Sequence, residues 1–196
     1  TTTKGRRIGL LGGSFNPAHA GHREISEHAL TALALDEVWW LVSPQNPLKD
    51  ETGMAPFDER IASAQTIVDN SPMANQIRVS DMEQDLGTRY SVDTIGALQQ
   101  RHANDYFVWI IGADNLVQMP DWQRWEDLMQ TVPVAVFDRP GYSQQALSGV
   151  AAKRFAHARL DPDQRQQLVT TAPPAWVFLQ DVQNPASATE IRTQNS

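Results

Sequence analysis

The chain has 196 residues, 41% of them hydrophobic, and a formal net charge of −7 at pH 7. This length can bury a sizeable core and falls within the range of one domain, so we expect a single domain over residues 1–196. The acidic balance argues against a nucleic-acid binder, since affinity for a phosphate backbone requires a basic face. The absence of cysteine excludes disulfide frameworks, thiolate zinc sites and cysteine nucleophiles.

The sequence also bears on the compartment. No apolar run approaches the roughly 20 residues that a membrane-spanning helix needs. The stretch from Thr1 to Arg7 lacks the apolar segment of a signal peptide. We therefore expect a cytoplasmic protein without a membrane partner, and the lack of cysteine fits a reducing compartment. The sequence leaves open whether the protein is a monomer or a homo-oligomer.

The amino-terminal part of the chain has the pattern of a βαβ unit. The apolar run at residues 8–11 stops at two glycines, which predicts a buried strand entering a tight turn. A helix is predicted from about His22, because apolar residues recur there every four positions on one face. Residues 37–42 predict a second strand. Such a unit implies a parallel sheet with a right-handed crossover.

The alternation of strands and helices continues along the rest of the chain. The further predicted elements are helix 58–69, strand 77–79, helix 91–101, strand 107–111, helix 122–129, strand 134–137, a polar helical excursion over 141–167, strand 177–179 and a final helix starting at 189–192. This pattern predicts an α/β fold with a doubly wound, Rossmann-like parallel sheet flanked by helices. Ligands of such sheets bind beyond the carboxyl ends of the strands, so the turns there are the first candidates for a site.

The turn after the first strand carries the strongest local pattern. It reads Gly12-Gly13-Ser14-Phe15-Asn16-Pro17-Ala18-His19-Ala20-Gly21-His22. Glycines let the backbone approach a phosphate, and the amino end of the next helix offers N–H groups and a positive dipole. His19 and His22 can donate from their ring nitrogens to the same anion.

Two other interpretations of this turn are a purely structural role and a metal site. It could be purely structural, with surface or helix-capping histidines, because short motifs are weak signals. A metal site is a further alternative, although no third and fourth ligand stand nearby in the sequence. Neither the dinucleotide fingerprint G-x-G-x-x-G nor the P-loop G-x-x-x-x-G-K-[ST] is present, which disfavours dehydrogenases and P-loop NTPases.

The turn resembles the H-x-G-H signature of the nucleotidylyltransferase superfamily. A second superfamily signature, I-S-S-T-x-I-R, is similar to Ala186 to Arg192, where alanine replaces the isoleucine and one serine. Further segments resemble bacterial nicotinate mononucleotide adenylyltransferases in particular: residues 43–49, 88–94, 110–122 and the R-P-G-Y of 139–142. The likeness covers nearly the whole chain and is weakest between Tyr142 and Trp176.

The resemblance implies a single nucleotidylyltransferase domain and assigns its site position by position. The residues expected to act catalytically at the phosphates are His19, His22, Lys49 and Arg192. The residues expected to bind ATP are Gly12, Gly13, Ser14, Phe15, His19, His22, Gly112, Asp114, Ser187, Thr189 and Arg192. The residues expected to bind the mononucleotide are Asn16, Lys49, Thr88, Tyr90 and Trp122. In this assignment Trp122 lies along the pyridine ring, and backbone near Thr88 receives the nicotinate carboxylate.

Several of these residues also have a structural interpretation. Trp122 could be one more core aromatic, although it follows a proline in a predicted loop. Asp114 could cap a short helix, and Lys49 could be an ordinary solvated lysine. Thr189 could be a helix N-cap, which is compatible with phosphate binding at the same helix end.

The implied activity is transfer of the adenylyl group of ATP to nicotinate mononucleotide, giving nicotinate adenine dinucleotide and pyrophosphate in NAD biosynthesis. The attacking phosphate is already ionised, so alignment and charge neutralisation suffice without a general base. Mg²⁺ is expected to arrive with ATP, and no protein metal site is predicted. The alternatives are an H-x-G-H adenylyltransferase for nicotinamide mononucleotide or pantetheine phosphate, and a non-catalytic nucleotide sensor.

Overall fold

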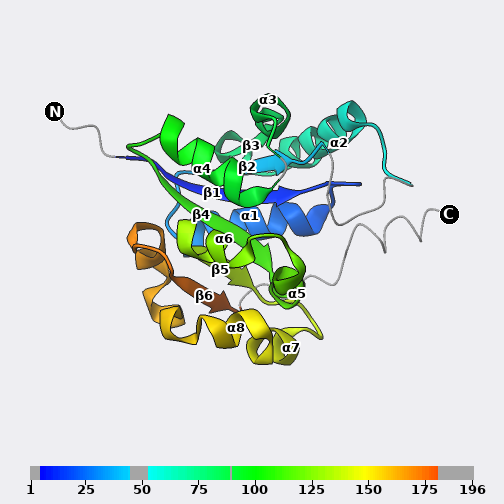
Figure 1. Cartoon of the computed structure of the whole chain (residues 1–196). Helices are drawn as coiled ribbons and strands as arrows, with labels where there is room; N and C mark the ends of the chain where they lie inside the picture. Colours follow the sequence, from blue (N-terminus) through cyan, green and yellow to red (C-terminus); the bar gives the residue numbers. More distant parts are fainter. Residues whose placement is uncertain (1–4, 45–52, 89, 181–196) are drawn as a thin grey trace.

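A six-stranded parallel sheet forms the centre of the computed structural model, which describes residues 5–44, 53–88 and 90–180 (Figure 1). The strands are β1 (Arg7–Gly13), β2 (Glu37–Val42), β3 (Ile77–Ser80), β4 (Tyr106–Gly112), β5 (Val134–Phe137) and β6 (Trp176–Leu179). They lie in the order β3-β2-β1-β4-β5-β6, and each neighbouring pair is parallel. This arrangement confirms the predicted doubly wound sheet.

Helices connect the strands on both sides of the sheet. The α-helices are α1 (Ala20–Ala32), α2 (Phe57–Asp69), α3 (Met82–Leu86), α4 (Ser91–Arg101), α5 (Ala113–Gln118), α6 (Trp125–Thr131), α7 (Ser143–Ser148) and α8 (Val150–Arg154). The 3₁₀ helices are η1 (Ala74–Gln76), η2 (Met119–Asp121), η3 (Ala156–Ala158) and η4 (Pro162–Thr170). The helix predicted over 122–129 begins later, because Trp122 is extended and Arg124 has a left-handed φ of 58°.

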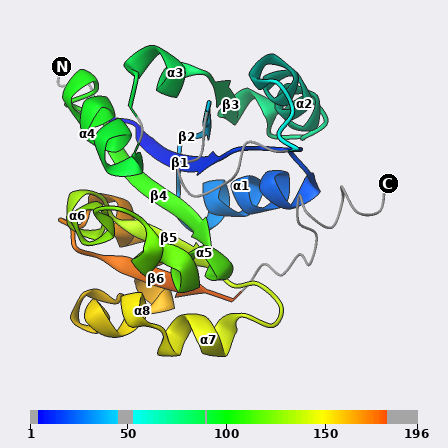
Figure 2. The ribbon, with the colours of Figure 1, turned by 45° about the vertical axis from the view of Figure 1, so that its right-hand side comes forward.

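Side chains of β1, β2, β4, β5 and β6 alternate between two cores, one on each face of the sheet. Along β2, Trp39 and Leu41 belong to the core under α4 to α8, whereas Trp40 belongs to the core under α1, α2 and η4. In Figure 2 the strands descend from β3 to β6, with α4 and α6 on the left and α1 and α2 on the right. Both faces are therefore covered, as a parallel sheet requires.

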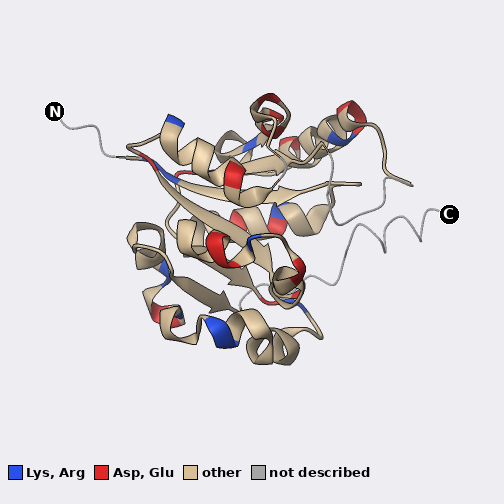
Figure 3. Ribbon diagram, in the orientation of Figure 1, with Lys and Arg blue, Asp and Glu red and all other residues tan. Residues whose placement is uncertain are grey.

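Acidic residues gather at helix amino ends. The first turns of α2, α3 and α6 each carry two carboxylates (Figure 3). Negative charge at this end interacts favourably with the helix dipole. Within the described part of the chain, no helix has the length and apolar character needed to cross a bilayer.

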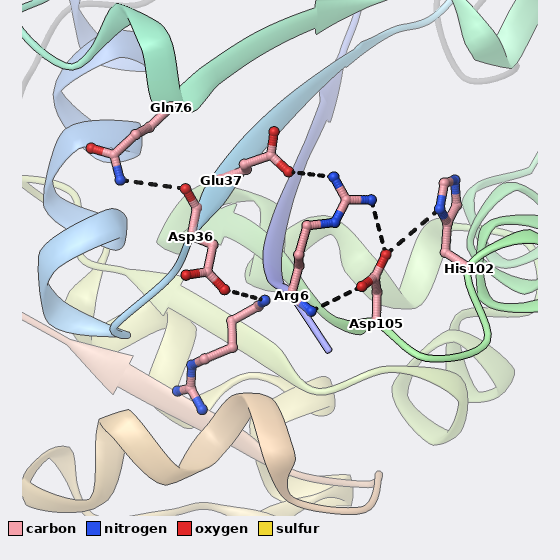
Figure 4. Close-up of polar contacts among 7 residues, drawn as sticks. Arg6, Asp36, Glu37, Gln76, His102 and Asp105 are labelled. Atoms are coloured by element: carbon pink, nitrogen blue, oxygen red, sulfur yellow. Dashed lines mark hydrogen bonds and ion pairs between the residues drawn. The ribbon is translucent and has the colours of Figure 1, made fainter. Parts of the chain in front are cut away.

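An ion-pair network closes the amino edge of the sheet, where β1, β2 and β4 begin (Figure 4). Arg6 lies 2.9 Å from Glu37 and 3.0 Å from Asp105, and His102 lies 3.6 Å from Asp105. Burial alone would raise the pKa of the Asp105 carboxyl, but hydrogen bonds and positive charge from Arg6 lower it overall. The Arg6 side chain is 46% exposed, so each of its pairs contributes at most about 1 kcal/mol.

The two glycines at the end of β1 correct the prediction of a tight turn. Gly12 and Gly13 both belong to the strand, where they lie opposite Leu41 and Val42 of β2. A Cβ on Gly12 would lie 2.4 Å from a ring carbon of Trp109, so this glycine makes room for an indole of β4. The turn that leads to α1 therefore starts after the glycines rather than at them.

The buried carboxyl of Glu83 on α3 gives the stability of the fold a pH dependence. Glu83 is 8% exposed, and burial raises its pKa to about 7. A group whose pKa is higher in the folded state stabilises the fold below its unfolded pKa, and this contribution is lost as pH rises through about 7. We expect Glu83→Gln to change the free energy of unfolding little at pH 5 and to raise it by about 1–3 kcal/mol at pH 8.5. Urea unfolding of both proteins at the two pH values measures this, and equal effects at both would contradict it.

Candidate active site

The candidate site lies at the carboxyl edge of the sheet, where β1 and β4 end beside each other. The chain leaves β1 toward β2 and leaves β4 toward β5, so the strand order reverses here, which is where ligands of such sheets bind. His19 and His22 follow β1, and Asp114 follows β4. Residues predicted from two separate turns are thus brought to one edge.

His19 and His22 cap helix α1 reciprocally. Nδ1 of His19 accepts from the Gly21 N–H at 3.0 Å, and Nδ1 of His22 accepts from the His19 N–H at 3.1 Å. The pair forms a capping box in which two imidazoles replace the usual hydroxyl and carboxylate. A neutral imidazole that accepts at Nδ1 carries its proton on Nε2. The capping alternative is therefore confirmed, and it leaves both rings in the tautomer that donates from Nε2.

Phe15 supports the histidines from the core side. Its ring is 2% exposed, stacks on Trp40 with centroids 5.1 Å apart and lies 4.6 Å from the His22 ring. The Trp40 indole N–H donates to Ser26, whose hydroxyl donates to the His22 carbonyl at 2.8 Å. The Phe15 side chain thus belongs to the core, and the ATP contact predicted at this position stays a prediction for its main chain only.

Asp114 lies in the first turn of α5 beside a glycine that makes room for it. The alternative in which Asp114 caps the helix is wrong, because Gly112 is the N-cap and no side chain caps this helix. The Asp114 carboxylate instead pairs with Arg139 at 3.0 Å, and both side chains stay about one-fifth exposed, at 22% and 23%. A Cβ on Gly112 would lie 2.7 Å from Oδ1 of Asp114. Gly112, Asp114 and Arg139 therefore form one unit across β4 and β5.

Three of the residues predicted to bind the mononucleotide, Thr88, Tyr90 and Trp122, lie on two segments that an ion pair joins. Thr88 has its hydroxyl 2.6 Å from a threonine hydroxyl of α4, and Tyr90 is the N-cap of that helix. Asp93 of α4 lies 2.6 Å from Arg124, which precedes α6. Tyr90 and Trp122 are partly buried and pack against the same core. Trp122 therefore combines a core contact with a partly exposed ring.

Arg60 is a site-adjacent residue that sequence reasoning missed. It lies on α2 at the same spacing as Ala64 and Val68, and all three are buried. An arginine on the apolar face of a helix was the available signal, because a buried charge requires specific partners. Its guanidinium contacts the turn after β1 through the Ser14 carbonyl at 2.8 Å.

Four predicted phosphate-binding residues lie outside the described residues. They are Lys49, Ser187, Thr189 and Arg192, together with the predicted final helix. Within the described ranges, no three histidine or acidic side chains are grouped so that they could hold a metal ion.

A side chain at position 112 would push against the Asp114 carboxylate. We expect Gly112→Ala to fold but to displace the Asp114 carboxylate and weaken ATP binding about 10-fold or more, the value of a lost charged hydrogen bond. Gly96→Ala in α4 is the matched control, since no atom lies within 4 Å of its added Cβ. The control should keep its ATP affinity and gain about 0.5–1 kcal/mol of stability. Calorimetric titration measures both, and unchanged affinity in Gly112→Ala would contradict the assignment.

The chain matches known proteins over nearly its whole length. Residues 10–194 match the cytidylyltransferase-like family. A relative from Parvibaculum lavamentivorans, named "Probable nicotinate-nucleotide adenylyltransferase", is 50% identical over 97% of this chain and 92% of its own. A relative of the same name from Gluconobacter oxydans is 49% identical over 95% of this chain and 93% of its own.

Solved structures agree on the fold. The nicotinic acid mononucleotide adenylyltransferase of Plasmodium falciparum, complexed with NaAD, superposes with a TM-score of 0.69 at 17% identity, over 96% of this chain and 83% of its own. The same protein complexed with APC gives a TM-score of 0.68. The family match, the identity to bacterial relatives and the shared fold agree: the chain belongs to the cytidylyltransferase-like family and, within it, to the nicotinate-nucleotide adenylyltransferases.

Proposed function

We propose that this chain transfers the adenylyl group of ATP to nicotinate mononucleotide, forming nicotinate adenine dinucleotide and pyrophosphate in NAD biosynthesis. The observation that carries the proposal is that the paired histidines follow β1 while Gly112 and Asp114 lie at the end of β4, so both stand at the switch point of the sheet. The bacterial relatives named for this activity support the choice of acceptor.

The proposed reaction is attack by the mononucleotide phosphate on the α-phosphorus of ATP. The attacking oxygen is ionised at neutral pH, so the protein aligns two phosphates and stabilises the charge that develops between them. His19 and His22 suit this role because their Nδ1 atoms are engaged in capping, which puts a donor on each Nε2. Mg²⁺ binds readily through substrate phosphates while keeping several waters, so on this proposal ATP brings the ion with it.

The other site residues would bind either ATP or the mononucleotide. Asp114 would accept from the ribose hydroxyls of ATP, on the β4 side of the site. Trp122 would lie along the pyridine ring, and backbone N–H groups near Thr88 would bind the nicotinate carboxylate. The phosphate contacts proposed from the sequence motifs outside the described residues are those of Lys49, Ser187, Thr189 and Arg192.

The choice of acceptor tests the proposed function. We expect kcat/KM for nicotinate mononucleotide to be at least about 30-fold higher than for nicotinamide mononucleotide. A carboxylate accepts from two N–H donors of the protein, whereas the NH₂ of a carboxamide would face one of these donors without a hydrogen bond. Pyrophosphate release is measured with ATP and each acceptor in parallel, with phosphopantetheine as a third. A ratio near one, or a preference for phosphopantetheine, would require a different acceptor assignment.

A pair of variants separates the two roles of His19. Asparagine is a strong N-cap, so His19→Asn should keep the helix end, whereas His19→Ala should lose about 1 kcal/mol of stability. Both variants lack the imidazole donor, and we expect kcat to fall about 100- to 1,000-fold in each. Steady-state kinetics and urea unfolding measure the two effects. If His19→Asn keeps more than about a third of wild-type kcat, His19 is a cap alone.

A further inference from the structure

Arg60 is a buried charge held by main-chain carbonyls. It is 2% exposed, and no carboxylate in the described part of the chain lies within ion-pair distance of its guanidinium. Nη1 donates to Ser14 at 2.8 Å and Ser43 at 2.7 Å, Nη2 donates to Pro44 at 3.1 Å, and Nε donates to Ala55 at 2.9 Å. A guanidinium can hold several acceptors at fixed angles, which a flexible ammonium cannot.

The acceptors of Arg60 belong to three segments around the site. Ser14 is the first residue after β1, and Ser43 and Pro44 follow β2. Ala55 precedes α2, so this one side chain joins the turn before the histidines to both ends of the β2–α2 connection. Burial lowers the pKa of the Arg60 guanidinium, as expected for a charge removed from water.

Asn16 closes the same network from the other side. Its Oδ1 accepts from the Ala55 N–H at 3.1 Å, and its Nδ2 donates to the Gly53 carbonyl at 3.2 Å. Ala55 is thus bonded through its carbonyl to Arg60 and through its N–H to Asn16. The turn after β1 and the start of α2 are consequently fixed to each other through one residue.

We propose that Arg60 is a positioning residue for adenylyl transfer, which holds the histidine-bearing turn in register with the β2–α2 connection. The inference rests on the proposed function, in which the histidines of this turn act on the phosphates of the reaction. Reactions that depend on alignment are sensitive to such register, since a misplacement of about 1 Å can lower a rate about 100-fold. Arg60 touches no substrate in this proposal and acts through the backbone it holds.

Arg7 provides a matched control at the opposite edge of the sheet. Its guanidinium also donates to three main-chain carbonyls, those of Leu33 at 2.9 Å, Ala34 at 2.7 Å and Gln166 at 2.6 Å. Arg7 begins β1, whereas the turn that carries the histidines follows the end of that strand. The two arginines therefore make similar bonds, and only Arg60 makes them beside the site.

The test compares Arg60→Lys and Arg7→Lys with the wild-type chain. Binding-competent sites are counted by calorimetry with an ATP analogue that has a methylene group between the α- and β-phosphorus, which adenylyl transfer cannot cleave. We expect kcat per competent site to fall about 10- to 100-fold in Arg60→Lys, with both KM values within about threefold of wild type. Arg7→Lys should keep kcat per site within about threefold. A normal kcat per site in Arg60→Lys, or an equal loss in Arg7→Lys, would overturn the inference.

Arg60→Gln is the second variant, because its amide keeps a donor without burying a charge and favours folding where lysine does not. Amide hydrogen exchange of the peptides around Ser14 and Ala55 tests the restraint without any turnover. Exchange of both should accelerate in Arg60→Gln and stay unchanged in Arg7→Lys. If the wild-type chain releases no pyrophosphate with nicotinate mononucleotide, the proposed function is wrong. If amide exchange in Arg60→Gln equals that of the wild type, only the positioning role of Arg60 is wrong.

Discussion

The parallel pairing of β1 with both β2 and β4 is the constraint on which the site depends. Because the two connections diverge from neighbouring strands, the carboxyl ends of β1 and β4 are not covered by a shared crossover. The packing of Gly12 against Trp109 helps to hold these two strands together. The histidine pair and Asp114 therefore follow neighbouring strands at the same edge of the sheet.

In the proposed mechanism, capping and catalysis use different nitrogens of the His19 and His22 rings. The backbone N–H groups that His19 and His22 accept are groups that every helix start leaves without an intrahelical partner. Their need for an acceptor fixes the tautomer of both imidazoles. Local folding thus prepares the histidines before any substrate arrives, and the buried Phe15 ring supports them. Preorganisation of this kind lets donors act without rearrangement during the reaction.

Sequence reasoning succeeded where the signal was local. The apolar run of β2 and the apolar spacing of α4 gave their bounds, and the H-x-G-H motif located the histidine turn. Sequence reasoning failed where the role of a residue depends on a contact with a residue far away in the sequence. Gly12 looked like a turn glycine, but its partner is an indole on another strand. The capping alternative for Asp114 did not foresee Arg139, which follows β5 and pairs with it. Arg60 was missed because its partners are main-chain carbonyls, which leave no trace in the pattern of side chains.

The contact between Gly112 and Asp114 links two positions that a reader of sequences would treat as independent. A Cβ at 112 would displace the Asp114 carboxylate, so the glycine is favoured only while the aspartate is kept in this position. In a chain of this fold with a small residue in place of Asp114, position 112 would no longer need to be glycine. The two positions should therefore change together among related sheets, and glycine here marks the presence of the acid rather than a flexible backbone.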